Sequence, residues 1–159
     1  MCEYCGCRSL ASIADLTRGH DAGATLVSHV RDAGREGDIA RLAELARTIA
    51  AVPAPHTQLE EQGLFPAMAE EFPDHIAALE DEHRRIEAVL AEAADGPPAD
   101  AGRPERLLDA LALLREHILK GHDGVFPAAL ASLSTHQWEA VDAVRAPVGS
   151  RVPQPSHSA

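Results

Sequence analysis

The stretch HTQLEEQGLFP, residues 56–66, returns in a related form as HILKGHDGVFP, residues 117–127. Both stretches begin with a histidine and end with Phe-Pro at the same offset, although the chain has only 3 phenylalanines among 159 residues. Apolar residues at helical spacing run through both stretches. The repeat therefore predicts two helices related by an internal pseudo-symmetry, and it raises the question of what the two histidines do.

The composition favours helices over strands. Apolar residues make up 45% of the chain and aromatic residues only 3%, and alanine and leucine, both strong helix formers, dominate the apolar set. Apolar stripes at helical spacing form four long segments separated by Gly- and Pro-marked breaks. We therefore predict an all-α protein, an up-down-up-down four-helix bundle with a short C-terminal helix. The expected parts are a Cys-rich segment at 1–9, the bundle at 10–131, the short helix at 132–146 and a disordered tail at 147–159.

Capping and breaking residues set the expected helix boundaries. A proline inside a helix costs about 3 kcal/mol or kinks it, so the second segment is expected either to kink at Pro53 and Pro55 or to restart at Pro55. The predicted segments run from about Ser12 to Gly34, from Asp38 to Gly63, from Asp74 to the break ADGPPADAG, from Pro104 to a loosened end at Gly121 and Gly124, and from Ser134 to Arg145.

The charge balance argues against a nucleic-acid partner. The chain has 14 Lys and Arg against 25 Asp and Glu, a formal net charge of -11, and such a surface repels phosphate backbones. No apolar run approaches the ~18 residues of a membrane helix. The first residues, MCEYCGCRSL, lack the basic start and apolar stretch of a signal peptide. We expect a cytoplasmic protein with no membrane partner.

Each of the four long segments carries one histidine on its apolar stripe. A single histidine of this kind is usually a core residue with a hydrogen-bond partner nearby. Burying an imidazole without a partner costs several kcal/mol, however, and an Ala/Leu core does not supply four separate partners. A shared metal ion would satisfy all of them together. The four residues are His20, His56, His83 and His117.

The second segment also carries the carboxylate that a metal site needs. Glu60 follows His56 by one helical turn, so both side chains can reach one metal. Glu61 is the next candidate, although a surface role suits it better. Inward-facing Glu and His residues on neighbouring helices build dinuclear iron or manganese centres, and this donor set favours iron over copper or zinc. The remaining histidines are predicted to lie at the surface, at positions 29, 75, 136 and 157.

Taken in order, these motifs resemble the hemerythrin family, specifically its bacterial HHE cation-binding branch, over roughly residues 10–130. The resemblance implies a di-iron centre of two non-haem irons, oxo- or hydroxo-bridged, that binds dioxygen, nitric oxide or peroxide, with an electron donor that the sequence does not identify. The ligand set expected for this chain is His20, His56, Glu60, His83 and His117, with His122 as a substitute ligand. The residues that carry it are His20, the run from His56 to Glu60 with Leu64-Phe65-Pro66, Glu82-His83 followed by Ile86, and His117 ahead of Phe126-Pro127.

The chain departs from the family at two ligand positions. Leu79 stands where relatives with two histidines on the third helix have the second one, and Gly121 stands where the fourth helix would carry an acid. His122 is then a substitute ligand, which binds one metal and cannot bridge two as a carboxylate does. Gly121 is expected to let the helix bend so that His122 or Asp123 turns inward, and Glu87 is another source of the missing acid.

The three cysteines, Cys2, Cys5 and Cys7, all lie in the first seven residues. They form either a reduced tail or a segment that brings a thiolate towards the metal site. The leading hypothesis is a di-iron protein that binds, senses or reduces a small oxidant, and in the last case it would be an oxidoreductase. The alternatives are a metal-binding protein without turnover, used for iron storage or for redox or metal sensing through the cysteines, and a structural bundle whose histidines only hydrogen-bond.

Overall fold

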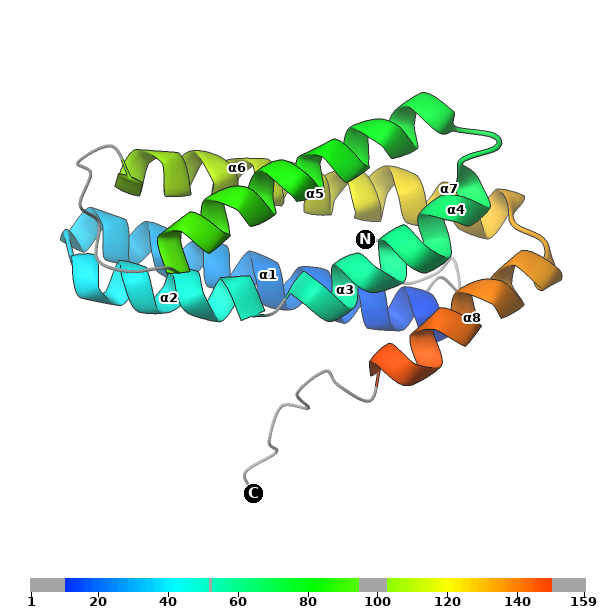
Figure 1. Cartoon of the computed structure of the whole chain (residues 1–159), viewed down its shortest axis with the longest axis horizontal. Coiled ribbons are helices and arrows are strands. Elements are labelled where there is room, and N and C mark those ends of the chain that lie inside the picture. The colour runs from blue at the N-terminus through cyan, green and yellow to red at the C-terminus, as the bar shows by residue number, and fades with distance from the viewer. Residues whose placement is uncertain (1–10, 52, 95–102, 150–159) are drawn as a thin grey trace, which may run out of the picture.

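The computed structural model describes residues 11–51, 53–94 and 103–149, and it is helical there apart from short turns (Figure 1). No strand occurs among these residues, so the all-α prediction is confirmed. None of their helices combines the length and the apolar character that crossing a membrane requires. Four helices contact one another around the core, namely α1 (Ala11–Glu36), α2 (Ile39–Ala51), α5 (Pro73–Ala94) and α6 (Arg103–Lys120).

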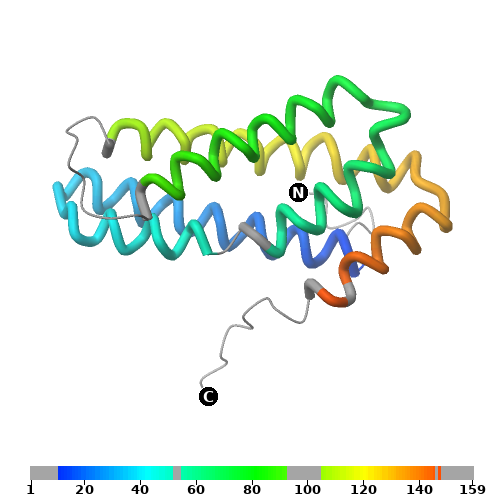
Figure 2. The backbone as a smooth tube through the Cα atoms, viewed as in Figure 1, coloured from blue at the N-terminus to red at the C-terminus, as the bar shows by residue number. Residues whose placement is uncertain are grey.

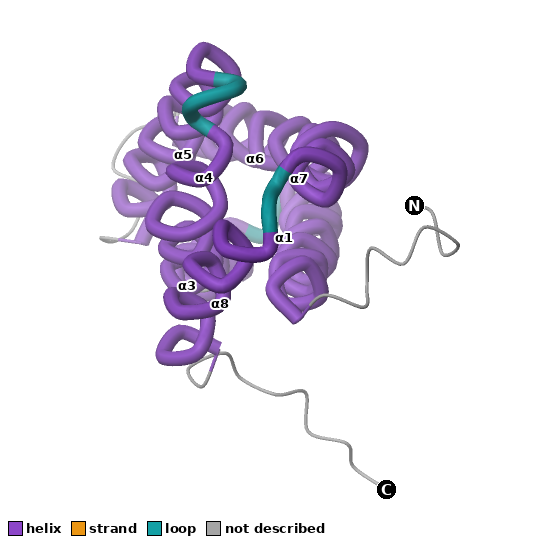
Figure 3. The backbone as a smooth tube through the Cα atoms, turned by 90° about the vertical axis from the view of Figure 1, so that its right-hand side faces the viewer, coloured by secondary structure: helices purple, strands orange, loops and turns teal. Residues whose placement is uncertain are grey.

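The long helices pack around a common core. Helix α1 contacts α2 and α6, and α5 contacts the same two helices, so the contacts close a ring that Figure 3 shows from one end. Gly37 makes the turn between α1 and α2 with a φ of 68°, a backbone conformation that favours glycine. Asp38 caps α2 as predicted, since its side chain accepts a hydrogen bond from the Arg41 backbone N–H.

The sequence repeat corresponds to a wide helical turn that occurs twice. The turns are π-helical, and the Phe65 N–H bonds the Glu60 carbonyl as the Phe126 N–H bonds the Gly121 carbonyl. The next residue in each repeat is a proline, which has no N–H to continue α-helical bonding at that point. The predicted loosening after α6 is therefore a π turn in a continuous helical path (Figure 2). The elements are α3 (Pro53–Leu59), η2 (Glu60–Leu64) and α4 (Phe65–Met68) in the first repeat, and η3 (Gly121–Val125) and α7 (Phe126–Ser132) after α6 in the second.

Two apolar clusters fill the core. One surrounds Leu16, Phe65 and Phe126, and the other surrounds Val30 and Leu90. Along α1, α5 and the segment from α6 to α7, a buried histidine lies between the residues of one cluster and those of the other. The core is therefore divided in the middle by a polar layer.

Helix α8 (Thr135–Gly149) lies against α1, α3 and η2. Val141 is fully buried beside Gly63, and Trp138 packs on the same cluster. The helix extends beyond the predicted end at 146 and includes Pro147. The cysteine segment and the tail from residue 150 lie outside the described residues.

Candidate metal centre

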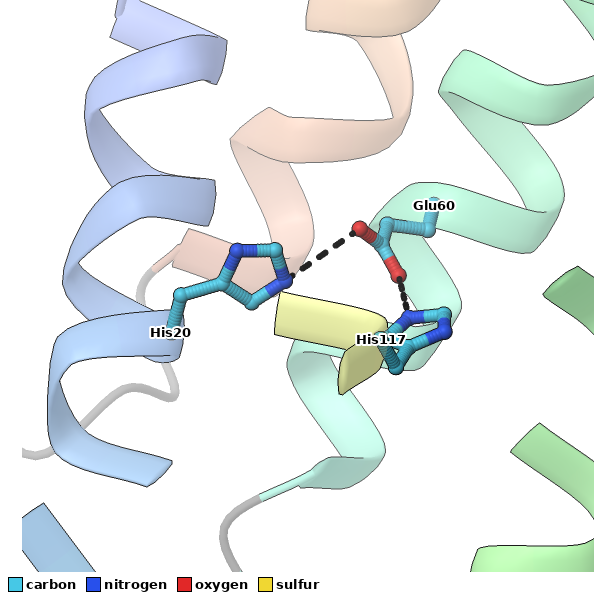
Figure 4. A group of neighbouring side chains, drawn as sticks. All are labelled: His20, Glu60 and His117. Atoms are coloured by element: carbon cyan, nitrogen blue, oxygen red, sulfur yellow. Dashed lines mark ion pairs between the residues drawn. The ribbon is translucent and has the colours of Figure 1, made fainter. Parts of the chain in front are cut away.

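The polar layer contains four imidazoles that converge on one carboxylate. Glu60 is only 1% exposed, and His20, His83 and His117 are almost as deeply buried. His20, Glu60 and His117 point towards one another from three separate segments (Figure 4), with ligand atoms within 4.8 Å of one another. His56 reaches Glu60 from one turn earlier on the same segment. The structure thus brings these side chains together in one region of the core.

The imidazoles divide evenly between the two oxygens of Glu60. Oε1 lies 3.4 Å from Nε2 of His56 and 3.6 Å from Nε2 of His20. Oε2 lies 3.0 Å from Nε2 of His83 and 3.5 Å from Nε2 of His117. Each oxygen thus faces a pair of imidazoles from two helices. We call His20 with His56 the first half-site and His83 with His117 the second half-site.

The half-sites have nearly the same internal geometry. The rings of the first lie 4.4 Å apart with an interplanar angle of 54°, and those of the second lie 4.4 Å apart at 53°. The phenylalanines of the repeat complete this pseudo-symmetry. Phe126 stacks on His20 at 5.2 Å, and Phe65 stacks on His83 at 5.6 Å. Phe65 of the first repeat thus packs on the half-site that contains His117 of the second repeat. Phe126 of the second repeat packs on the half-site that contains His56 of the first.

Two glycines make room for the first half-site. A Cβ atom on Gly19 would lie 2.6 Å from Nδ1 of His56, and one on Gly121 would lie 2.5 Å from Cε1 of His20. Both distances are too short for a side chain of any size. Gly121 was expected to bend the helix and turn a later residue inward. It is buried in the π turn and accommodates the His20 ring, and the next residue, His122, is partly buried and stacks against that ring.

Two carboxylates accept hydrogen bonds from the Nδ1 atoms of the second half-site, on the side of each ring away from Nε2. Nδ1 of His83 donates to Glu61 at 2.9 Å, and Nδ1 of His117 donates to Glu82 at 3.1 Å. Lys120 donates to the other oxygen of Glu82. Such bonds fix the imidazole tautomer, so that the lone pair of Nε2 faces the site.

Sequence reasoning assigned no role to Glu82. The signal was present, because a carboxylate three residues after Leu79 and four before Ile86 lies on the apolar stripe of its helix. A charged residue at such a position is rarely buried without a partner.

The hydrogen bonds of the cluster do not satisfy all of its buried nitrogen and oxygen atoms. Nε2 of His83 lies 2.8 Å from Nε2 of His117, although both Nδ1 atoms already donate to carboxylates. Two lone pairs at this distance repel each other unless a proton or a metal lies between them. Both ring nitrogens of His20, Nε2 of His56 and Oε2 of Glu60 are buried without a hydrogen-bond partner. Buried polar atoms are normally paired, so the cluster has the donor atoms of a metal site.

The spacing of these atoms fits a coordination shell. Two ligand atoms that are each about 2.1 Å from one metal and about 90–110° apart lie roughly 3.0–3.4 Å from each other. The nitrogen to oxygen distances at Glu60 run from 3.0 to 3.6 Å. Imidazole and carboxylate together suit iron, manganese and zinc. The residues present therefore fit a metal ion at this cluster.

Comparison with protein families identifies the domain. The model of the hemerythrin HHE cation binding domain matches residues 11–129, most of the chain. This chain belongs to the hemerythrin HHE cation-binding family. Neither the curated proteins nor the solved structures compared with it gave a match. As a member of the HHE family, the chain carries a cation-binding domain, and its cluster of histidines and Glu60 could hold the metal.

The other candidate ligands of this HHE domain lie around the cluster. His122 is partly buried and stacks against His20 with ring centres 5.0 Å apart. Asp123 and Glu87 are exposed, and Glu87 lines the cavity described below. Leu79 is buried in the apolar core. His29, His75 and His136 are exposed as predicted, and His157 lies outside the described residues.

A small cavity of about 40 Å³ adjoins the four imidazoles. Apolar side chains from several helices form most of its remaining wall, among them Leu26, Ile49 and Ile86. The cavity therefore has room for a ligand of very few atoms beside the cluster.

The electrostatics of the cluster keep Glu60 ionised. Burial alone would raise the pKa of Glu60, but the imidazoles of His56, His117 and His20 outweigh it and hold this pKa well below its ordinary value. Burial lowers the pKa of His20 from 6.5 to about 4, so its ring is neutral at physiological pH. The pKa of His83 is raised, because Glu60 and Glu61 outweigh the effect of burial. The centre thus combines an anionic carboxylate with a neutral His20, which suits a divalent cation, and a cation bound at His83 would displace the proton that its raised pKa favours.

Proposed function

We propose that the protein is a hemerythrin-like di-iron protein, built on an up-down-up-down four-helix bundle. Its two irons would be held by His20, His56, Glu60, His83 and His117, with His122 as a sixth ligand beside His20. The supporting observation is the even division of four imidazoles between the two oxygens of one buried carboxylate. A core histidine with only a structural role needs one partner, and it does not need three other imidazoles around the same group.

The proposed ligand is a small oxidant, namely dioxygen, nitric oxide or peroxide, which the protein binds, senses or reduces in the cytoplasm. Bound iron would supply an open coordination position and the capacity to change oxidation state. The size of the cavity and its apolar wall support a ligand of this class. Reduction would also require an electron donor from outside the chain.

The residues of the chain have three tasks in this proposal. Glu60 links the half-sites through its two oxygens. Glu61 and Glu82 orient the imidazoles of the second half-site. Phe65 and Phe126 fix the ring planes of His83 and His20 and keep water away from one side of each ring.

Metal analysis of the purified protein tests the proposal. We expect two irons per chain and a visible spectrum of an oxo-bridged ferric pair that bleaches with dithionite. His83→Ala should lose at least one metal, whereas His29→Ala, at an exposed position on α1, should lose none. Unchanged metal content in His83→Ala would favour a purely structural role for the core histidines.

A turnover assay separates the two metal-binding hypotheses. Iron-loaded protein should consume peroxide or nitric oxide at a rate that His83→Ala reduces. Full iron content without turnover of either compound would favour the alternative, a metal-binding protein for storage or sensing.

A further inference from the structure

The pseudo-symmetry of the two half-sites fails at the residues behind the imidazoles. Gly19 and Glu82 occupy matching positions, since each directly precedes the first histidine of its half-site. Both positions face Nδ1 of the second histidine. Glu82 accepts a hydrogen bond from His117 there, whereas Gly19 places only backbone against His56. One imidazole therefore has a carboxylate behind it, and its counterpart has a glycine.

A second pair of matching positions differs in the same direction. Glu61 and His122 are each the sixth residue of their repeat. Glu61 accepts a hydrogen bond from Nδ1 of His83, a member of the second half-site. His122, the proposed sixth ligand, stacks on His20, a member of the first. At this position the first half-site gains a further donor atom but lacks the negative charge that Glu61 gives to the second half-site.

These differences should affect the affinity of each half-site for a cation. A carboxylate on Nδ1 fixes the tautomer, holds the ring in place and makes Nε2 a stronger donor. His83 and His117 both have this support, and Lys120 anchors Glu82 in turn. Nδ1 of His20 has no hydrogen bond, so the ring lacks the support that a carboxylate gives to Nδ1 of His83 and of His117.

We propose that the half-sites bind metal in a fixed order, with the second half-site filled first and more tightly. The first half-site then binds the second metal with lower affinity, and the protein has a stable one-metal form. This inference rests on the proposed two-metal function. Loss of one supporting carboxylate typically lowers metal affinity about 10–100-fold, so we expect the two binding steps to differ by at least about tenfold.

An anaerobic titration of metal-free protein with ferrous iron, followed by calorimetry, tests the order. The wild-type chain should show a tight step and a weaker step. His117→Ala should remove the tight step, and His56→Ala should remove the weak one. Glu82→Ala should weaken the tight step about 10–100-fold and leave the weak step unchanged.

Matched variants separate positioning from general effects on the fold. Glu82→Gln keeps an acceptor oxygen for His117 and should restore part of the lost affinity. Asp81→Asn removes a charge at the neighbouring exposed position, where Asp81 pairs with Arg84 at the surface, and should change neither step. Glu61→Ala, on a different element, should also weaken the tight step, and it tests the proposal independently if Glu82→Ala does not fold.

Two equal steps in the wild-type chain would overturn the order and leave the two-metal function intact. Equal weakening of both steps in Glu82→Ala and Glu61→Ala would likewise overturn it. If the wild-type chain binds no iron, the proposed function itself fails, and the two failures are therefore distinguishable.

Discussion

A methyl group added at Gly121 should disturb the first half-site more than a methyl group added elsewhere in the π turn. In Gly121→Ala the new Cβ would lie 2.5 Å from Cε1 of His20. Carbon atoms in contact lie about 3.5–4.0 Å apart, so one of the two groups must move by roughly 1 Å. His20 has little freedom to move, because it is 2% exposed and its ring lies against Phe126, His122 and His56.

Gly124 provides a matched control within the same turn. No atom lies within 4 Å of a Cβ placed on Gly124. Alanine gains about 1 kcal/mol over glycine in a helix, and this gain is common to both variants. The difference between Gly121→Ala and Gly124→Ala therefore isolates the cost of overpacking, which we expect to be about 1–3 kcal/mol in favour of Gly124→Ala.

The same displacement should weaken metal binding. A binding constellation tolerates misplacement of about 0.5 Å, and Nε2 of His20 is already 3.6 Å from Oε1 of Glu60. Urea denaturation of the metal-free proteins measures the stability difference, and iron titration measures the loss in the weaker step. If Gly121→Ala matches Gly124→Ala in both measurements, the close contact with His20 does not limit the site, and the reasoning is wrong.

Three further predictions concern the first half-site. Gly19→Ala should weaken the second iron-binding step but destabilise the fold less than Gly121→Ala, because His56 is more exposed than His20 and can move outward, as iron titration and urea denaturation would show. Phe126→Leu should cost about 0.5–1.5 kcal/mol of stacking with His20, and a urea midpoint equal to wild type would contradict this. In the metal-free protein, the lowered pKa of His20 means that its contribution to stability is complete above pH 6.5 and is lost as the pH falls towards 4, by roughly 3 kcal/mol at most. Urea denaturation from pH 7 to pH 4 should therefore show a shallower loss in His20→Gln, and equal slopes would refute the assignment.

The sequence was sufficient to place the main polar groups of the core. Helical periodicity depends on local spacing, and it put His20, His56, His83 and His117 on inward faces where the structure has them. Glu60 followed from its spacing to His56. The exposed positions of His29, His75 and His136 followed from the same rule. These predictions succeeded because the direction of a side chain on a helix is fixed by its position in the chain.

The features that sequence analysis missed depend on contacts between segments far apart in the chain. The π turns displace the register by one residue, and nothing in a single repeat distinguishes such a turn from a loosened helix end. The role of Gly121 depends on His20, which lies about a hundred positions earlier. Glu82 was visible on an apolar stripe, but its partner His117 belongs to another helix. Spacing within one helix carries no information about such pairs.

The repeat explains the shape of the centre, and its departures from symmetry explain the chemistry that we propose. Glu60 in the first repeat matches Gly121 in the second. Glu60 faces both half-sites, whereas the ring of His20 fills the space that a side chain at Gly121 would occupy. A second carboxylate at Gly121 would exclude that ring from its present position. The chain thus combines two similar histidine pairs with one shared anion, and it places the remaining supporting carboxylates, Glu61 and Glu82, behind only one pair. Because a metal responds to the charge and hydrogen bonds of its surroundings as well as to its direct ligands, equal geometry at the two pairs does not imply equal affinity.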